Sequence, residues 1–293
     1  MDLVVGATGA VGKQITLQLL EKKRKMRALI RGGRERAEAK PFLDLGAEIA
    51  DGDLTAPDTL RPACAGIDTI VCTATSMPHG RDDGLRRVDH DGVLALIETA
   101  TKSGVRKFIY TSYSGRIRED SPLKTAKRDC EKRLLASALQ AVILRPSYFM
   151  EAWLSPALGF DPQQGRARIY GSGKEKVSYI SGQNVVGFAV AVCTRELTER
   201  QVVLEIGGPE PLSQLEAVSI FEKALRKKIT PEFIPLEALA AQHRSATDPL
   251  QKTFAALTLG YAKGDVIPES GANAERYGIR LRSVSDYANT LRA

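Results

Sequence analysis

The sequence predicts an α/β fold, a doubly wound parallel sheet with a smaller C-terminal α+β lobe on the substrate side. Short apolar runs alternate with amphipathic stretches up to about residue 150, an order typical of a parallel sheet covered by helices. This rhythm stops after Pro146, where Pro and Gly become frequent. We therefore predict a sheet domain over 1–149 and a lobe over 150–293, with part of 176–206 returning to the main sheet.

Six apolar runs are the candidate strands, and four amphipathic stretches between them are the candidate helices. The strands are expected at 3–5, 26–30, 47–50, 69–72, 107–110 and 141–144, and the helices at 11–20, 57–64, 88–103 and 125–139. In the first helix Val11, Ile15 and Leu19 recur every fourth residue, a stripe that packs on a sheet. Because βα crossovers are right-handed, the carboxyl ends of the strands share one edge, where a ligand is expected.

The C-terminal lobe has a different pattern. Residues 167–181 are expected to form two short strands around a glycine turn, and 201–206 a further strand. An amphipathic helix is expected at 214–226, whereas the apolar positions of 236–262 recur at irregular helical spacing. We expect this last segment to form the substrate-side lobe.

Charge and composition narrow the class of protein. Lys and Arg outnumber Asp and Glu by 42 to 35, and basic residues cluster at 22–27 and 31–36 without the interleaved aromatics of a single-strand binder. An anionic cofactor explains the clusters better than nucleic acid does. The four cysteines show no CxxC spacing, which favours buried thiols in a reducing compartment over a zinc or redox site. No apolar run reaches the roughly 18 residues of a spanning helix, so we expect a cytoplasmic protein without a membrane segment.

A glycine turn directly follows the first strand and precedes the first helix. Gly6, Gly9 and Gly12 have the spacing GxxGxxG in the run LVVGATGAVG. In this context the first two glycines bring backbone amides up to a pyrophosphate, and the third lets helix and strand approach each other. The helix N-terminus adds partial positive charge. The sequence therefore predicts a dinucleotide-binding domain of the Rossmann type.

The residues after the second strand indicate which dinucleotide is bound. Arg31 follows that strand, Arg34 is three residues on, and no acidic residue precedes Glu35. An arginine here pairs with a 2′-phosphate, whereas an acid would bind the ribose hydroxyls of NAD, so NADP (NADPH) is favoured. Asp53 and Leu54 follow the third strand, where they could contact the adenine; Asp53 could equally cap the helix that begins near residue 57.

The chain resembles the NmrA-like group of atypical short-chain dehydrogenases/reductases along nearly its whole length. The resemblance rests on GATGAVG at residue 6, RALIRGG at 27, DGDL at 51, GVRKFIYTS ending at 112, SPLKTAKRDCEKRLLASALQAVILRPSYFMEAW from 121, and IGGPEPLS at 206. It implies an NADP(H) site that adds Thr8, Ala10 and Val11 in the phosphate turn, Ala74 and Thr75 near the nicotinamide ribose, and Pro146, Tyr148 and Phe149 by the carboxamide.

The same resemblance implies catalytic residues. Ser112 and Tyr113 would face the nicotinamide, and Lys127 would hydrogen-bond its ribose. Ordinary short-chain dehydrogenases carry a proton-donating tyrosine four residues before this lysine, but this chain has Leu123 there, which puts the usual carbonyl reduction in doubt. A second match to YxxxK, Tyr170 with Lys174, contains two glycines and is interpreted as a turn.

The histidines give little support to a metal site. His79, His90 and His243 are too few and too widely spaced for one. His90 is expected to face solvent or cap a helix, whereas His79, in the loop after the fourth strand, is kept as a candidate acid. A GxSxG nucleophile motif is absent from the sequence.

Three functions fit these residues. The first is an NADPH-dependent oxidoreductase whose acceptor is a small apolar molecule, a quinone or a carbonyl or enal compound, bound between the Rossmann domain and the C-terminal lobe. The second is a non-catalytic NADP-sensing regulator that binds a protein partner, an alternative favoured by Leu123; a homodimer is also left open. A sugar-nucleotide epimerase or dehydratase ranks last, because its chemistry needs the missing tyrosine.

Overall fold

The computed structural model describes residues 1–78 and 84–292, which form two compact units. The first unit comprises Met1–Ser112, Pro122–Leu144 and Val186–Leu204, and the second comprises Tyr113–Ser121, Arg145–Val185 and Glu205–Ala293. Each unit therefore takes its residues from several parts of the chain. The division between folding domains at residues 149 and 150 stays a prediction.

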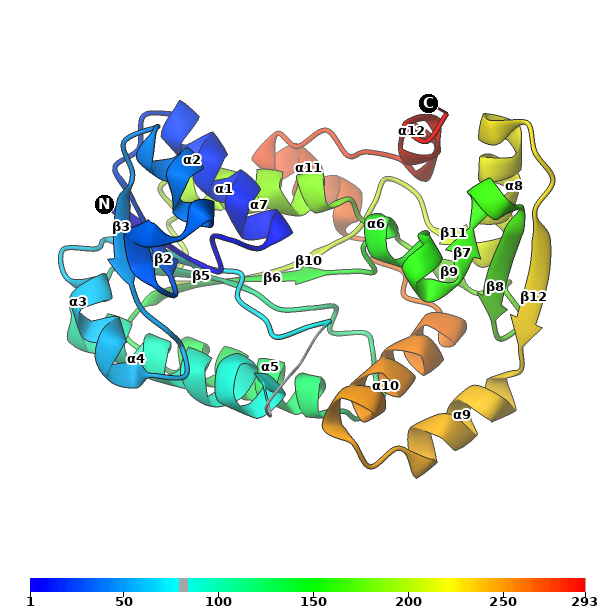
Figure 1. Ribbon diagram of the computed structural model, residues 1–293, viewed down its shortest axis with the longest axis horizontal. Helices are drawn as coiled ribbons and strands as arrows, with labels where there is room; N and C mark the ends of the chain where they lie inside the picture. Colours follow the sequence, from blue (N-terminus) through cyan, green and yellow to red (C-terminus); the bar gives the residue numbers. More distant parts are fainter. Residues whose placement is uncertain (79–83, 293) are drawn as a thin grey trace. The chain divides into compact units, whose positions relative to one another are not determined.

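A seven-stranded sheet is the centre of the first unit (Figure 1). Its order is β10 (Gln201–Ile206), β6 (Gln140–Pro146), β5 (Lys107–Thr111), β4 (Thr69–Cys72), β1 (Asp2–Val5), β2 (Met26–Ile30) and β3 (Glu48–Asp51). The pairs from β6 through to β3 are parallel. Because β1 lies between β4 and β2, the chain winds outward from it in both directions, and the predicted doubly wound fold is confirmed.

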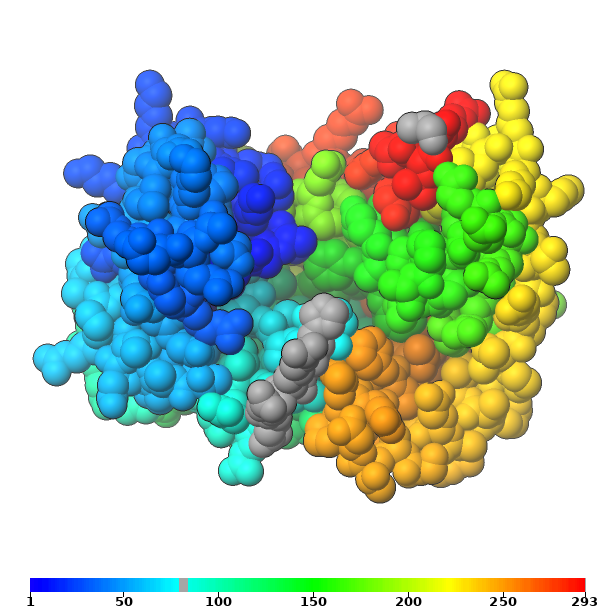
Figure 2. Space-filling view, in the orientation of Figure 1, coloured from blue at the N-terminus to red at the C-terminus, as the bar shows by residue number. Residues whose placement is uncertain are grey.

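Helices cover both faces of this sheet (Figure 1). Figure 1 shows α1 (Ala10–Glu21) and α7 (Gly182–Thr194) on one face, and α3 (Leu60–Cys64), α4 (Val93–Lys102) and α5 (Pro122–Leu135) on the other. Every residue of β1 and β4 is buried, as expected for strands covered on both faces. In the space-filling view, the blue N-terminal part of this unit and the lighter blue part that follows it in the sequence lie side by side (Figure 2).

Two of the expected helices differ from the prediction. The single helix expected at 88–103 is a π-helix, η4 (Leu85–Gly92), followed by α4. The helix expected from residue 125 begins at Pro122, where proline fits the first helical position because its missing N–H has no partner there in any helix. The short elements η1 (Gly33–Glu35), η2 (Ala37–Ala39), α2 (Lys40–Leu43) and η3 (Pro57–Thr59) connect β2, β3 and α3.

The second unit contains two small sheets and several helices. In one sheet β8 (Arg166–Tyr170) pairs parallel with β12 (Thr230–Ile234) and antiparallel with β7 (Phe160–Asp161). In the other, β9 (Lys176–Val177) pairs with β11 (Leu212–Ser213), so the two strands expected around the glycine turn belong to different sheets. The other elements are α6 (Met150–Trp153), η5 (Pro156–Leu158), η6 (Pro162–Gln164), α8 (Gln214–Leu225), α9 (Leu236–Ser245), α10 (Pro249–Lys263), α11 (Ser270–Tyr277) and α12 (Val284–Asn289).

The core of the second unit is rich in aromatic side chains. Tyr148, Trp153, Tyr170 and Tyr261 are buried together with ring centroids 4.4–6.4 Å apart. Such edge-on contacts add to the free energy gained by burying the rings. Among the described residues, no helix has both the length and the apolar character needed to cross a membrane.

Candidate nucleotide-binding site

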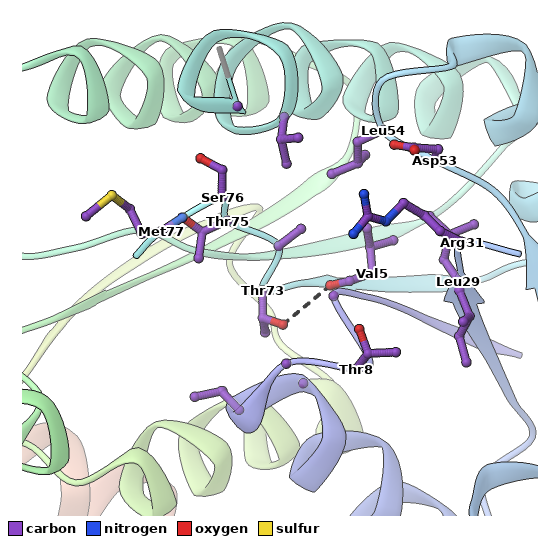
Figure 3. A pocket seen from close by; sticks show the side chains of 18 of the residues that line it. Val5, Thr8, Leu29, Arg31, Asp53, Leu54, Thr73, Thr75, Ser76 and Met77 are labelled. Carbon is purple, nitrogen blue, oxygen red and sulfur yellow. Dashed lines mark hydrogen bonds between the residues drawn. The ribbon is translucent and has the colours of Figure 1, made fainter. Parts of the chain in front are cut away.

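A cavity of about 820 Å³ lies in the first unit, at the carboxyl ends of β1, β2 and β4 (Figure 3). This is the edge of the sheet at which ligands bind in doubly wound folds. It is lined by Val5, Gly6, Thr8, Gly9, Ala10, Val11, Gly12, Leu29, Ile30, Arg31, Gly52, Asp53, Leu54, Thr73, Ala74, Thr75, Ser76, Met77, Pro78, Gly84 and Val88. The cavity therefore brings together four separate segments for which the sequence predicts nucleotide contacts.

The glycine turn forms the floor of this cavity. Gly6 has a φ of +89°, which favours glycine, and the amide of Gly9 donates to the carbonyl oxygen of Gly6 at 3.0 Å. A Cβ on Gly12 would lie 2.1 Å from that same oxygen and 2.7 Å from Oγ1 of Thr73. Helix α1 begins at Ala10 without a side-chain cap, so its first amides are open to an anion. The turn thus fits a pyrophosphate.

Arg31, Asp53 and Leu54 form one end of the cavity. In Figure 3 the guanidinium of Arg31 extends from the end of β2 into the cavity, beside Asp53 and Leu54. The turn behind Arg31 is fixed because the amide of Gly32 donates to Oδ1 of Asp51 at 2.9 Å. A cation next to an apolar side chain and a carboxylate suits the phosphate, ring and amine of a phosphorylated adenosine.

One detail at this end differs from the sequence interpretation. Oδ1 of Asp53 accepts from the amide of Thr55 at 2.8 Å, whereas η3 is preceded by Ala56 and has no side-chain cap. The capping alternative for Asp53 is therefore wrong, because its carboxylate closes its own turn instead. Arg34 lies exposed on η1, outside the residues that line the cavity, and its contact with a 2′-phosphate stays a prediction.

The opposite end of the cavity is formed by the segment after β4. Ala74 and Thr75 line it, together with Thr73 and Ser76, which the sequence analysis missed, and the contact of Ala74 and Thr75 with a nicotinamide ribose stays a prediction. Oγ1 of Thr73 donates to the carbonyl oxygen of Val5 at 3.4 Å, which joins this segment to β1 (Figure 3). The backbone amide and the hydroxyl of Ser76 both donate to a carboxylate on η4, as described below.

Lys127 lies buried on α5 and is not among the residues that line the cavity. Its Nζ donates to the carbonyl oxygen of Thr111 at 3.3 Å and lies 3.7 Å from Oδ1 of Asp89. The same Nζ is 5.0 Å from the centre of the Tyr110 ring. Leu123, one helical turn earlier, is buried and carries no proton to donate. The ribose contact of Lys127 therefore stays a prediction.

Burial keeps the tyrosine hydroxyl and the two thiols nearest to this lysine in their neutral forms. Burial raises the pKa of the Tyr110 hydroxyl well above its usual value, and it raises the pKa of the Cys72 and Cys130 thiols to about 11 and about 12. All four cysteines are free and buried, as predicted. Thiols in this state are poor nucleophiles, so we assign them a packing role. Ser112 is also buried, and its Oγ accepts from Nη1 of Arg128 at 3.2 Å.

The other predicted site residues belong to the second unit. Tyr113 packs against the apolar core of that unit, and the carbonyl oxygen of Pro146 accepts from the amide of Ser114 at 2.9 Å. The hydroxyl of Tyr148 donates to the carbonyl oxygen of Leu257 at 3.1 Å, and burial raises its pKa well above the usual value. Phe149 directly precedes α6. Contacts of these residues with a nicotinamide stay predictions.

A buried carboxylate fixes the segments that follow β5 and β6 within this second unit. Oδ1 of Asp265 accepts from Ser114 Oγ and Oδ2 from Ser147 Oγ, both at 2.7 Å. Burial raises the pKa of Asp265, which the two hydroxyl donors partly offset. The segments that contain Tyr113 and Tyr148 are thus held by one side chain that is more than a hundred residues away in the sequence.

The two histidines that the structure describes, His90 and His243, contact oxygen atoms of nearby residues. His90 lies 2.6 Å from an oxygen of Asp91 and 3.3 Å from one of Asp129, and Nε2 of His243 lies 2.7 Å from the carbonyl oxygen of Asp120. His79 lies outside the described residues. Over residues 1–78 and 84–292, no group of His, Cys, Asp and Glu could hold a metal ion.

The turn expected at Tyr170 and Lys174 is present, since β8 ends at Tyr170.

Comparison with known proteins identifies the family. The NmrA-like family model matches residues 3–264. The chain is 29% identical to photosystem II assembly factor Ycf39 of Trieres chinensis over 80% of this chain and 72% of that protein. It is 26% identical to an NAD(P)H azoreductase of Xenophilus azovorans over 92% of each chain. Matches to relatives in Arabidopsis thaliana and Synechocystis cover only 58% and 62% of those proteins.

A solved structure shares the fold along the whole chain. The NADPH complex of the quinone oxidoreductase QOR2 from Escherichia coli matches with a TM-score of 0.81 and covers 100% of both chains at 20% sequence identity. At this identity the likeness shows the fold alone.

Proposed function

The chain belongs to the NmrA-like family, and from this premise we propose that it binds NADP(H) and acts as an NADPH-dependent oxidoreductase. The observation that carries the proposal is the cavity of the first unit, where the glycine turn lies between Arg31 at one end and Ser76 at the other. The turn offers open helix amides to a pyrophosphate, and Arg31 offers a guanidinium to a 2′-phosphate. The azoreductase relative, matched over 92% of both chains, supports a nicotinamide nucleotide as the ligand.

The acceptor we propose is a small apolar molecule, a quinone or a carbonyl or enal compound. When bound, the nicotinamide supplies the hydride. Leu123 is buried where a proton-donating tyrosine would be needed for ordinary carbonyl reduction, so the reduced acceptor takes its proton from water. A quinone suits such a site because its reduced oxygens are readily protonated by solvent. Contacts of the nicotinamide or the acceptor with Ser112, Tyr113, Pro146, Tyr148 and Phe149 are part of the same proposal, as is a cytoplasmic location.

The proposal is tested by following the nicotinamide absorbance of NADPH mixed with the purified chain and a panel of quinones, enals and azo compounds. We expect absorbance to be lost with at least one quinone, and to be lost more slowly with NADH. Arg31→Ala is the matched variant, because it removes the 2′-phosphate contact without altering the acceptor side of the cavity. NADPH binding with no turnover of any acceptor would contradict the enzymatic proposal.

A second candidate is a regulator that binds NADP(H) without turnover and associates with a protein partner. Two observations favour it, namely Leu123 in place of the tyrosine and the relatives that are assembly factors of photosystem II. The two candidates share the cavity and differ in the fate of the hydride. Failure to bind either NADPH or NADH would contradict both.

A further inference from the structure

Asp89 is a buried carboxylate to which neither the predicted site nor the proposed function assigns a role. It is 0% exposed and lies on η4, the π-helix that follows the segment after β4. Its Oδ2 accepts from the amide of Ser76 at 2.8 Å and from the hydroxyl of Ser76 at 2.6 Å. Within residues 1–78 and 84–292, its Oδ1 has no hydrogen-bond partner. A charge buried in this way is costly unless an opposite charge lies near it.

Lys127 supplies that opposite charge. Its Nζ lies 3.7 Å from Oδ1 of Asp89, and its side chain is only 6% exposed. The carbonyl oxygen of Thr111, at the end of β5, also accepts from this Nζ at 3.3 Å. The lysine is therefore fixed at one point by the sheet and at another by Asp89. Each of the two buried charges depends on the other.

The same carboxylate determines the position of one end of the cavity. Ser76 lines the cavity, and Val88, directly before Asp89 on η4, lines it as well. The start of the π-helix packs closely against Ser76, because a Cβ on Gly84 would lie 2.8 Å from Cβ of Ser76. π-Helical turns are frequently found at functional sites. One carboxylate thus joins the cavity wall to the buried lysine.

We propose that Asp89 is a positioning residue that joins Lys127 to the Ser76 end of the cavity and sets the affinity for the nicotinamide half of NADP(H), an inference that rests on the proposed function. Arg31 and Leu54 lie at the other end of the cavity, with the glycine turn between the two ends (Figure 3). If the adenosine half binds at the Arg31 end, the nicotinamide half lies at the Ser76 end. Changes at Asp89 should therefore affect one half of the ligand only.

The experiment measures the affinity of two probes by calorimetry. NADPH contains both halves, whereas adenosine 2′,5′-bisphosphate lacks the nicotinamide. Asp89→Asn and Lys127→Met should each weaken NADPH by roughly 10-fold or more, the effect of losing an interaction with a charged group, and should leave the bisphosphate unchanged. The double variant should bind NADPH no more weakly than the weaker single variant, because the two residues act as one unit. Asp91→Asn is the matched control, since its side chain is 54% exposed on the same helix.

Thermal unfolding of the same variants tests the buried pair separately from binding. Asp89→Asn leaves the ammonium of Lys127 buried without its counter-charge, so its Tm should fall by several degrees. The double variant removes both charges and should recover most of that loss. Equal weakening of both probes, or additive losses in the double variant, would overturn the role of Asp89. A wild-type chain that binds neither probe would instead overturn the proposed function, and with it the ligand assigned to this end.

Discussion

Replacing Gly12 by alanine tests the glycine turn most sharply. The new Cβ would lie 2.1 Å from the carbonyl oxygen of Gly6 and 2.7 Å from Oγ1 of Thr73, whereas ordinary contact begins at 3.4 Å. The carbonyl belongs to the backbone, so the turn itself must move by about 1 Å. Such overpacking costs about 1–3 kcal/mol, but alanine regains about 1 kcal/mol of helix propensity inside α1. The net loss in the free energy of unfolding is therefore small, about 0–2 kcal/mol.

Nothing offsets the effect of this change on nucleotide binding. If the moved turn loses one or two amide contacts to the pyrophosphate, each charge-assisted bond removes about 1.5–3 kcal/mol, so the Kd for NADPH should rise by about 10- to 100-fold or more. Gly271→Ala is the control, because on α11 its Cβ would meet no atom within 4 Å. Calorimetric titration measures the Kd, and urea denaturation measures the stability. An unchanged Kd for Gly12→Ala would refute the assignment of this turn to the pyrophosphate.

Two predictions concern stability rather than binding. Nζ of Lys107, whose pKa is lowered by burial, donates to the carbonyl oxygens of Val192 and Arg195 at 3.1 and 2.7 Å. Lys107→Met removes the donor from the buried carbonyl of Val192 and from the part-buried carbonyl of Arg195. It should lower the free energy of unfolding by about 1–3 kcal/mol in urea denaturation, and an unchanged value would contradict this. Glu216 caps α8 through Ser213 and contacts Lys176, and the pKa of its carboxyl falls to about 2. The ionised carboxyl of Glu216 therefore stabilises the folded chain fully above the unfolded pKa of about 4.3, and this stabilisation is lost as the pH falls through about 2. Glu216→Gln should cost about 0.5–1 kcal/mol at pH 7 and only a small part of that at pH 2, and a cost independent of pH would count against the charge.

The sheet could be predicted because its signals are local. The runs at 26–30 and 69–72 coincide with β2 and β4, since each is an apolar segment bounded by polar residues or glycine. The glycine turn and Arg31 were also predictable, because the residues that form this part of the cavity follow their strands directly in the sequence. Errors arose where two local signals compete. Asp53 is of a residue type that often caps helices, yet its carboxylate accepts from the amide of Thr55 and closes its own turn.

The remainder of the site depends on contacts that a sequence pattern does not contain. A π-helix has nearly the same apolar spacing as an α-helix, so η4 was predicted as the start of a longer regular helix. The link between Ser76, Asp89 and Lys127 joins three elements that are separated along the chain. Asp89 could have been suspected only because it follows Leu85 by four residues and so falls on the same, buried face of the helix. Its partners could not have been named before the fold was known.

Comparative titration of NADPH and NADH into the wild-type chain and Arg31→Ala tests the central claim most directly. The cavity of the first unit should bind one NADPH per chain, and the wild-type chain should prefer NADPH to NADH. Arg31→Ala should weaken NADPH by about 10-fold or more, through the loss of a charged hydrogen bond, and should leave NADH unchanged. Equal weakening of both nucleotides, or no binding of NADPH to the wild-type chain, would contradict the account.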